Sequence, residues 1–370
     1  MRGPMLFSPG PVMVEDCVRN SLLHYELCHR GGEFMEMFKD TQEKICKMYR
    51  ADSSYYSFIV SGSGTATNEL VLSSIFKPGD AVLLISNGVF GERLEEIIDK
   101  YQVPKIKPSF EWAQYPDAVE IEKCIVANPA VKVVAMVYHE TSTGMLNPVT
   151  EIGALCKKYN KIFSVDGISA SAGEDIDVVK QNIDIVTGVA GKCLGAYPGS
   201  AYVCGKESLM QGVTEEQCKN VYLNLYKHYA IAKKLSQTPN TPNVTLFWPL
   251  NTALTRLLER GIDAQVARYR ECAEIIRDGV KALGLRVLLD EKYMSSTVTS
   301  VFLPDGIEVE PFIEKLESDY GYVIYSGKGK YLTENMFQIA NMGNLTPVDC
   351  KRFLVSLERC LNDYAEAYSS

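Results

Sequence analysis

The chain has 370 residues, of which 46% are hydrophobic and 23% charged, and its formal net charge is −8. This length predicts two domains, and the negative charge argues against nucleic acid or an anionic membrane as a partner. Its eleven cysteines are odd in number and scattered without a CxxC pair, which is typical of reduced cytosolic thiols and not of a disulfide framework or a zinc site. No apolar run is long enough to span a bilayer, and the first residues lack the apolar stretch of a signal peptide. We therefore expect a cytoplasmic globular protein.

The N-terminal region is expected to be an arm over residues 1–14, because its proline-rich turn at 8–11 cannot be helical. Helices are predicted at 14–23 and at 34–49, the second from apolar residues at helical spacing. The polar loop between them contains His29 and Arg30. It is either a plain connection or a positively charged mouth in which Arg30 contacts a substrate, and the sequence favours neither interpretation.

A strand at 56–60 leads into a glycine-rich turn, Ser61-Gly62-Ser63-Gly64-Thr65, and then into a predicted helix. This order points free backbone N–H groups at a phosphate. The turn is not a Walker A loop, because no Gly-Lys-Ser/Thr follows, and it lacks the third glycine of the dinucleotide fingerprint. Alone it is a weak indication, since many strand–helix turns look similar.

Strands and helices then alternate, which predicts an α/β fold with a mostly parallel sheet. The strands are apolar on both faces and end in polar residues, where open α/β sheets bind ligands. The strands are expected at 81–85, 131–138, 161–165, 184–189 and 200–203.

Lys192 is held between the last two of these apolar strands, with glycines on either side. Its charge is costly there unless it is used or its pKa is lowered. The lysine either reaches water from a surface hairpin or forms a Schiff base with a carbonyl compound such as pyridoxal phosphate. Asp166, at a strand end, is either a helix N-cap or the partner of a protonated pyridine nitrogen. Phosphate loop, aspartate and lysine in this order favour pyridoxal phosphate as the cofactor.

The remaining chain predicts a helix at 226–235, an extended crossing segment at 236–248, and helices at 249–260 and 264–283. After Gly284, short strands alternate with helices, which is typical of a smaller α+β domain. The expected organisation is an arm at 1–14, a large cofactor-binding domain at 15–254 and a small C-terminal domain at 255–370.

The sequence resembles the class V aminotransferases of the fold type I pyridoxal-phosphate enzymes. Six motifs carry the resemblance: FSPGP (7–11), SGSGT (61–65), SNGVFGER (86–93), HETSTGMLNP (139–148), VDGISA (165–170) and GKCLGAYPG (191–199). They point towards the 2-aminoethylphosphonate branch, with the alanine–glyoxylate and serine–pyruvate branches close to it. The expected reaction moves an amino group between a small amine or amino acid and a 2-oxo acid such as pyruvate, as a step of phosphonate metabolism.

The resemblance implies a role for each motif residue. Lys192 would form the Schiff base and move the proton, and Asp166 would pair with the pyridine nitrogen. The other cofactor-binding residues are Ser63, Gly64 and Thr65 at the phosphate, Phe90 stacked on the ring, Thr141 at its phenolic oxygen and Thr241 reaching the phosphate of the other subunit. Thr238 and Thr245 compete with Thr241 for that role. A homodimer with shared active sites and no metal is implied.

Two departures from the family pattern affect function. Gln338 stands in Phe337-Gln338-Ile339-Ala340-Asn341, where relatives carry an arginine that holds the substrate carboxylate. A neutral amide cannot replace that charged fork, so either substrate recognition at Gln338 is altered or another cation has taken over. Lys328 and Lys330 are candidates, although a solvated basic loop is the favoured interpretation. Gly191 occupies the second position, where relatives often have Asn or Gln.

Two other functions remain as alternatives to an aminotransferase. A pyridoxal-phosphate lyase or decarboxylase on the same scaffold would tolerate loss of the carboxylate clamp. A catalytically silent scaffold protein would not need the carboxylate clamp at all. The retention of Lys192, Asp166 and the phosphate loop argues against that class.

Overall fold

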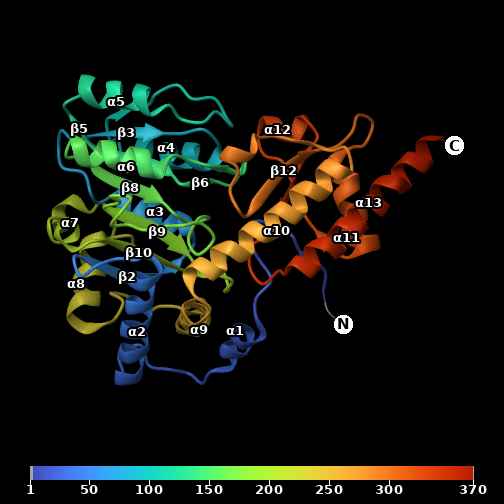
Figure 1. The fold of residues 1–370 in the computed structure, drawn as a ribbon. Helices are drawn as coiled ribbons and strands as arrows, with labels where there is room; N and C mark the ends of the chain where they lie inside the picture. Colours follow the sequence, from blue (N-terminus) through green and yellow to red (C-terminus); the bar gives the residue numbers. More distant parts are fainter. Residues whose placement is uncertain (1–2, 370) are drawn as a thin grey trace.

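The structure is a computed structural model that describes residues 3–369. A large α/β part is built on a seven-stranded sheet and a smaller α+β part on a four-stranded sheet (Figure 1). The large sheet has the order β2-β10-β9-β8-β5-β3-β4. Its strands are β2 (Tyr55–Gly62), β3 (Ala81–Ile85), β4 (Lys105–Ile106), β5 (Val131–Val137), β8 (Ile162–Asp166), β9 (Ile185–Val189) and β10 (Gly199–Lys206).

The direction of these strands brings the predicted site residues to one edge. All neighbouring strands are parallel except that β10 runs antiparallel to both β2 and β9. The strands β2, β9, β8, β5 and β3 therefore end at the same edge, as predicted for an open α/β sheet. The register places Asp166 beside Val137 on one side and Thr187 on the other.

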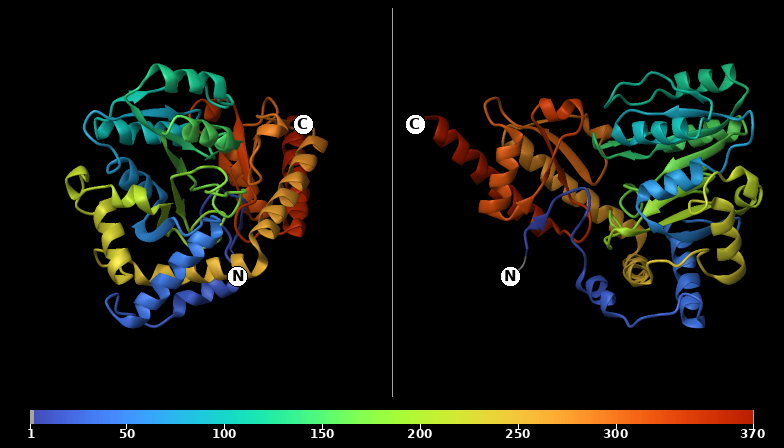
Figure 2. Two further views of the ribbon diagram at one scale, coloured as in Figure 1. Left: turned by 60° about the vertical axis from the view of Figure 1, so that its left-hand side comes forward. Right: turned by 180° about the vertical axis from the view of Figure 1, so that it is seen from behind.

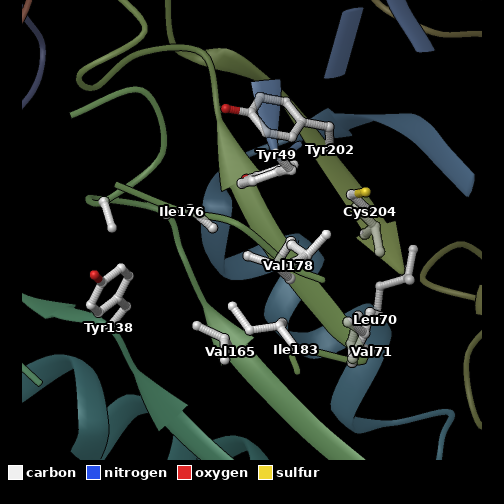
Figure 3. Packing of buried hydrophobic residues seen from close by; sticks show 14 of the residues in the cluster. Tyr49, Leu70, Val71, Tyr138, Val165, Ile176, Val178, Ile183, Tyr202 and Cys204 are labelled. Carbon is white, nitrogen blue, oxygen red and sulfur yellow. The ribbon is translucent and has the colours of Figure 1, made fainter. Parts of the chain in front are cut away.

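Helices cover the large sheet on both sides (Figure 2). They are α2 (Gly32–Met48), α3 (Gly64–Leu72), α4 (Val89–Lys100), α5 (Ala118–Ala127), α6 (Val149–Lys158), α7 (Glu207–Gln211), α8 (Leu225–Leu235) and α9 (Val244–Arg260). One continuous apolar core fills the space between sheet and helices, and Figure 3 shows part of it. In that view Leu70 and Val71 of α3 lie near Ile183, and Tyr49 lies beside Tyr202 of β10. Within residues 3–369, no helix combines the length and apolar character that crossing a membrane requires.

Helix α9 corrects one prediction, because the segment at 236–248 is extended only as far as Asn243. The helix continues through Pro249, although a proline inside a helix removes one backbone hydrogen bond. Phe247 explains this difference, since it is fully buried and its ring lies 6.0 Å from that of Phe34 on α2. Burial of a large aromatic side chain offsets the loss of one hydrogen bond.

The smaller part contains a sheet of order β11-β12-β15-β14. Its elements are α10 (Ile262–Ala282), β11 (Arg286–Val287), β12 (Val298–Phe302), α11 (Val309–Tyr320), β13 (Tyr322–Val323), β14 (Tyr325–Ser326), α12 (Lys330–Thr333), β15 (Met336–Ala340) and α13 (Pro347–Ser369). Helix α10 runs from the large part into the small one (Figure 1). Leu257 of α9 is the last buried residue of the large core, and Cys272 of α10 is the first residue after it that belongs to the core of the small part. Helix α9 therefore packs with the large part.

The beginning of the N-terminal arm, residues 5–7, joins the small part. Strand β1 (Met5–Leu6) pairs in parallel with β13. Phe7 is fully buried in the small core, where it stacks on Phe353 at 4.3 Å. Figure 1 shows this blue segment beside the small part, before the chain reaches α1 (Asp16–Asn20). Residues 8–11 are thereby held at the boundary between the two parts, next to the edge where the strands end.

Candidate active site

A cavity of about 550 Å³ lies at the carboxyl edge of the large sheet. Its walls come from the β2–α3 turn, the start of α4, the ends of β8 and β9, and Gly10 and Pro11 of the arm. This volume is within the range of about 300–1,000 Å³ that small-molecule sites occupy. The strand-end position is the one that the alternating sequence pattern predicted.

Lys192 lies in the turn between β9 and β10 and lines this cavity. Burial lowers the pKa of Lys192 to about 8, and the positive charges of Lys328 and Arg93 act in the same direction. The arm packs against its stem, because a Cβ added to Gly10 would lie 3.2 Å from Lys192 Cδ. A lysine that is partly neutral near pH 8 is a nucleophile towards carbonyl compounds. The surface-hairpin interpretation of Lys192 is therefore wrong.

Asp166, the last residue of β8, also lines the cavity and is 7% exposed. One carboxylate oxygen accepts a hydrogen bond from the backbone N–H of Ile168 at 2.9 Å, and the other accepts one from Asn68 Nδ2 at 2.6 Å. Burial raises the pKa of Asp166, and these hydrogen bonds and the charge of Lys192 oppose that rise. The carboxylate is held in place and can pair with a cationic group in the cavity.

Asn68 was not singled out from the sequence, although it orients Asp166. Its Oδ1 accepts a hydrogen bond from Thr187 Oγ1 at 2.6 Å, so α3 links the ends of β8 and β9. The available signal was spacing, because Asn68 follows Gly64 by four residues and lies on the same helix face.

The β2–α3 turn fits a phosphate group. Ser63 precedes α3 with an extended backbone, and its exposed side chain does not cap the helix. The first N–H groups of a helix have no partner within it, and the helix dipole favours an anion there. A Cβ on Gly64 would lie 2.5 Å from Ile168 Cδ1, so only glycine fits. Gly64, Ser63 and Thr65 all line the cavity, as the resemblance implied.

Phe90 lies in the first turn of α4, and a buried carboxylate fixes its backbone. Glu140 Oε2 accepts hydrogen bonds from the N–H groups of Phe90 at 3.1 Å and Gly91 at 3.0 Å. A Cβ on Gly88 would lie 2.5 Å from Glu140 Cδ, which explains the glycine in the motif. The ring of Phe90 lines the cavity and is available for stacking.

Three cations surround the Phe90 ring. Lys192 Nζ lies 5.8 Å from the ring centroid, Arg93 Cζ 5.0 Å and Lys328 Nζ 4.9 Å. The favoured interpretation of Lys328 as a solvated surface lysine is therefore wrong, because this partly buried side chain reaches from the small part to the ring of Phe90. Lys330 is exposed, and its Nζ lies over Tyr331 instead.

Thr141 and Gln338 are both buried just outside the residues that line the cavity. Thr141 Oγ1 lies 2.5 Å from Ser169 Oγ. Gln338 Nε2 donates to the backbone oxygen of Thr141 at 2.7 Å and to Ser300 Oγ at 3.0 Å. The amide of Gln338 thus holds the Thr141 loop against β12 and provides no charge for a substrate.

The second departure from the family pattern has a steric explanation. A Cβ on Gly191 would lie 2.9 Å from the backbone nitrogen of Pro198. The turn that carries Lys192 therefore has no room for the Asn or Gln side chain found in relatives.

The three competing threonines differ in exposure. Thr238 is buried and donates to the backbone oxygen of Asn240 at 2.6 Å, whereas Thr241 and Thr245 are exposed. Arg30 binds the same segment, because its guanidinium donates to Gln237 Oε1 at 2.7 Å and to Thr238 O at 3.1 Å. Arg30 therefore lies away from the cavity of its own chain and supports the segment that carries Thr241.

Comparison with known proteins agrees with this site. The profile of the aminotransferase class-V family matches residues 15–342, and the chain belongs to that family. It is 36% identical to an uncharacterised aminotransferase of Methanocaldococcus jannaschii, over 92% of this chain and 88% of the relative. It is 29% identical to a 2-aminoethylphosphonate–pyruvate transaminase of Klebsiella pneumoniae, over 97% and 98%. The crystal structure of a ureidoglycine–glyoxylate aminotransferase from Bacillus subtilis superimposes with a TM-score of 0.92 at 26% identity, covering 99% of this chain and 94% of that one.

The protein is an aminotransferase of fold type I, and its family depends on pyridoxal phosphate. The residues of the cavity fit that cofactor, since a lysine, a buried carboxylate, a helix start and an aromatic ring line the same space. His139 adds a further indication, because it lines the cavity and its buried Nε2 has no hydrogen-bond partner within residues 3–369. Among the same residues, no group of three or more His, Cys, Asp or Glu is arranged to hold a metal.

Proposed function

We propose that this aminotransferase moves the amino group of a small amine with an anionic head, of the 2-aminoethylphosphonate kind, to a 2-oxo acid such as pyruvate. The observation that carries the proposal is Gln338, which places a neutral amide, held through its Nε2 by Thr141 and Ser300, where relatives hold an α-carboxylate. A donor without an α-carboxylate does not need that clamp, whereas the carboxylate of pyruvate would need another cation, such as Arg93, which lines the cavity. Near-complete coverage of relatives named as 2-aminoethylphosphonate–pyruvate transaminases supports the same substrate class.

Each residue of the site would have one task. When bound, pyridoxal phosphate supplies an electron sink for the carbon that carries the amino group. Asp166, oriented by Asn68, would pair with the ring nitrogen, while the α3 start with Ser63, Gly64 and Thr65 would bind the phosphate. Phe90 would stack on the ring, and Thr141 would bind its phenolic oxygen. Lys192 would hold the cofactor covalently, and its Nζ would take up and return a proton near neutral pH.

The proposal includes a cytoplasmic homodimer in which each subunit completes the other's site. Exposed Thr241 would reach the phosphate of the neighbouring subunit, and Arg30 would hold the segment that carries it. Sedimentation of the wild-type protein should give twice the mass of the chain. Thr241→Ala should weaken cofactor affinity, whereas Thr245→Ala should not; the reverse result would assign the contact to Thr245.

A half-reaction tests the function. The cofactor-loaded protein should lose its yellow absorbance when 2-aminoethylphosphonate is added without an acceptor, and pyruvate should then restore the colour. Alanine and serine serve as the competing donors. Bleaching by alanine or serine alone would favour an alanine–glyoxylate or serine–pyruvate type of enzyme, the other two branches that the sequence resembles.

A further inference from the structure

Arg93 and Lys328 have no assigned task in binding the amino donor, although Arg93 lines the cavity and Lys328 lies over the ring of Phe90, which also lines it. Arg93 comes from α4 and Lys328 from the segment between β14 and α12, so the two parts of the molecule each supply one cation. Both lie within cation–π distance of the Phe90 ring, with Arg93 Cζ 5.0 Å and Lys328 Nζ 4.9 Å from its centroid. Neither side chain has a hydrogen bond or an ion pair within residues 3–369.

Such an arrangement is costly in the absence of an anion. Burial lowers the pKa of Lys328, and the neighbouring charge of Arg93 adds to that effect. The charge of Glu140 favours the charged form of Lys328, but the Glu140 oxygens already accept hydrogen bonds from the N–H groups of Phe90, Gly91 and Ser142. Unpaired like charges that converge on a cavity are typical of a site for an anionic ligand.

The arrangement also compensates for the missing arginine. Position 338 on β15 provides only a neutral amide, whereas the two cations approach the cavity from α4 and from the segment preceding α12. We propose that Arg93 and Lys328 together bind the head group of the amino donor, and that this group is a tetrahedral dianion, a phosphonate or phosphate monoester, and not a single carboxylate. This inference rests on the proposed function and deepens it.

Charge and shape both support a dianion. Two cations match a group that carries about −1.5 to −2 charge near pH 7, whereas a carboxylate or sulfonate carries only one negative charge. A guanidinium presents a planar fork that binds two oxygens, and an ammonium beside it can bind the third. Nearby Lys192 and Asp166 are assigned to the cofactor and so do not alter this match.

Dissociation constants of the cofactor-loaded protein test the proposal. The ligands are 2-aminoethylphosphonate, O-phosphoethanolamine and taurine, which share an aminoethyl chain and differ in the head group. The absorbance change of the cofactor measures binding in wild type, Arg93→Gln, Lys328→Met and the control Lys330→Met. The control removes an exposed lysine two positions away. Unchanged cofactor absorbance and melting temperature identify the folded variants.

We expect Arg93→Gln and Lys328→Met each to weaken binding of the dianionic amine by about ten- to a hundredfold. Taurine should be affected less, and Lys330→Met should match wild type. Tighter binding of 2-aminoethylphosphonate than of O-phosphoethanolamine assigns the site to phosphonates, and the reverse order assigns it to phosphate esters. Equal dissociation constants in Lys328→Met and Lys330→Met, or equal losses for taurine and the dianions, would overturn the proposal.

Ethylphosphonate separates this inference from the proposed function, because it carries the head group without an amine. Calorimetry of the loaded protein should detect ethylphosphonate binding that Lys328→Met weakens and Lys330→Met does not. Should no amine bleach the cofactor while ethylphosphonate still shows this pattern, the function would fail and the anion site would stand. Bleaching by 2-aminoethylphosphonate with unchanged affinity in Arg93→Gln and Lys328→Met would leave the function and refute the anion site.

Discussion

The two sides of the cavity differ in how the chain builds them. On the large-part side, Asp166 and the Lys192 turn directly follow strands of one sheet, and the parallel register brings them together. On the small-part side, Lys328 lies in an irregular segment, and Gln338 lies on β15 with its Nε2 already hydrogen-bonded to Thr141 and Ser300. The cofactor side keeps the residues of the family, and the substrate side departs from them. We therefore expect substitutions on the cofactor side to affect the chemistry and substitutions on the small-part side to affect substrate binding.

Loss of Lys192 tests the cofactor side and should have the largest effect. Lys192→Ala removes the covalent anchor and the proton carrier, and loss of acid–base catalysis alone costs about 10²–10⁴ in rate. Borohydride reduction of the loaded wild type, followed by mass spectrometry, should fix the cofactor on the peptide with Lys192. A reducible adduct on another lysine in Lys192→Ala would show that the site is assigned wrongly.

Asp166→Ala should have the next largest effect, a loss of about 10²–10³ in turnover, because the ring loses its preorganised ionic partner. The fold and much of the cofactor affinity should remain, since the phosphate and stacking contacts are intact. Steady-state turnover with a melting curve measures both. Turnover near that of wild type would mean that Asp166 does not pair with the ring nitrogen.

Asn68→Ala should lower turnover less, by about tenfold, because it removes one charge-assisted hydrogen bond to Asp166 and leaves the bond from Ile168. The pH profile distinguishes positioning from simple destabilisation. Burial already raises the pKa of Asp166 and Asn68 opposes that rise, so the acid limb of activity should move to higher pH. A lower melting temperature with an unchanged pH profile would indicate a structural role only.

The smallest effect should be that of Lys328→Met on the pH dependence of cofactor capture by Lys192. This effect would link the small-part side of the cavity to the large-part side. The neutral amine of Lys192 is the nucleophile, and burial lowers its pKa to about 8, so capture by the apo-protein should become faster as pH rises through about 8. The charge of Lys328 contributes to that lowering. Lys328→Met should therefore raise the midpoint, and Lys330→Met should leave it in place. A midpoint that falls or stays constant in Lys328→Met would place Lys328 away from Lys192.

Local patterns predicted much of the fold and the cofactor side of the site. Strand β3 lies at the predicted residues 81–85, because it is a short apolar run closed by polar residues and glycine. Asp166 and Lys192 were found because strand ends of a parallel sheet share an edge.

The remaining features depend on contacts between distant parts of the chain. The hydrogen bond from Asn68 to Asp166 joins residues 98 positions apart. The start of α9 depends on packing of Phe247 against α2, and the arm depends on pairing with β13. Two lysines in the sequence Lys328-Gly329-Lys330 look alike, and only the position of Phe90 in the folded chain distinguishes the buried one from the exposed one.

The most direct test of altered substrate recognition is one ratio, the dissociation constant of alanine divided by that of 2-aminoethylphosphonate. It should be measured in wild type, Gln338→Arg and Lys328→Met, with Gln338→Met as a control for volume without charge. An arginine at 338 offers the carboxylate of alanine a bidentate contact, which should tighten alanine binding by about ten- to a hundredfold. The same arginine should weaken binding of 2-aminoethylphosphonate, so the ratio should fall. Lys328→Met should lower the ratio by weakening the binding of 2-aminoethylphosphonate alone. Gln338→Met should not tighten the binding of alanine. If wild type already binds alanine as tightly as Gln338→Arg does, and Lys328→Met leaves phosphonate binding unchanged, another residue holds the anion and the substrate side of the site is that of an ordinary family member.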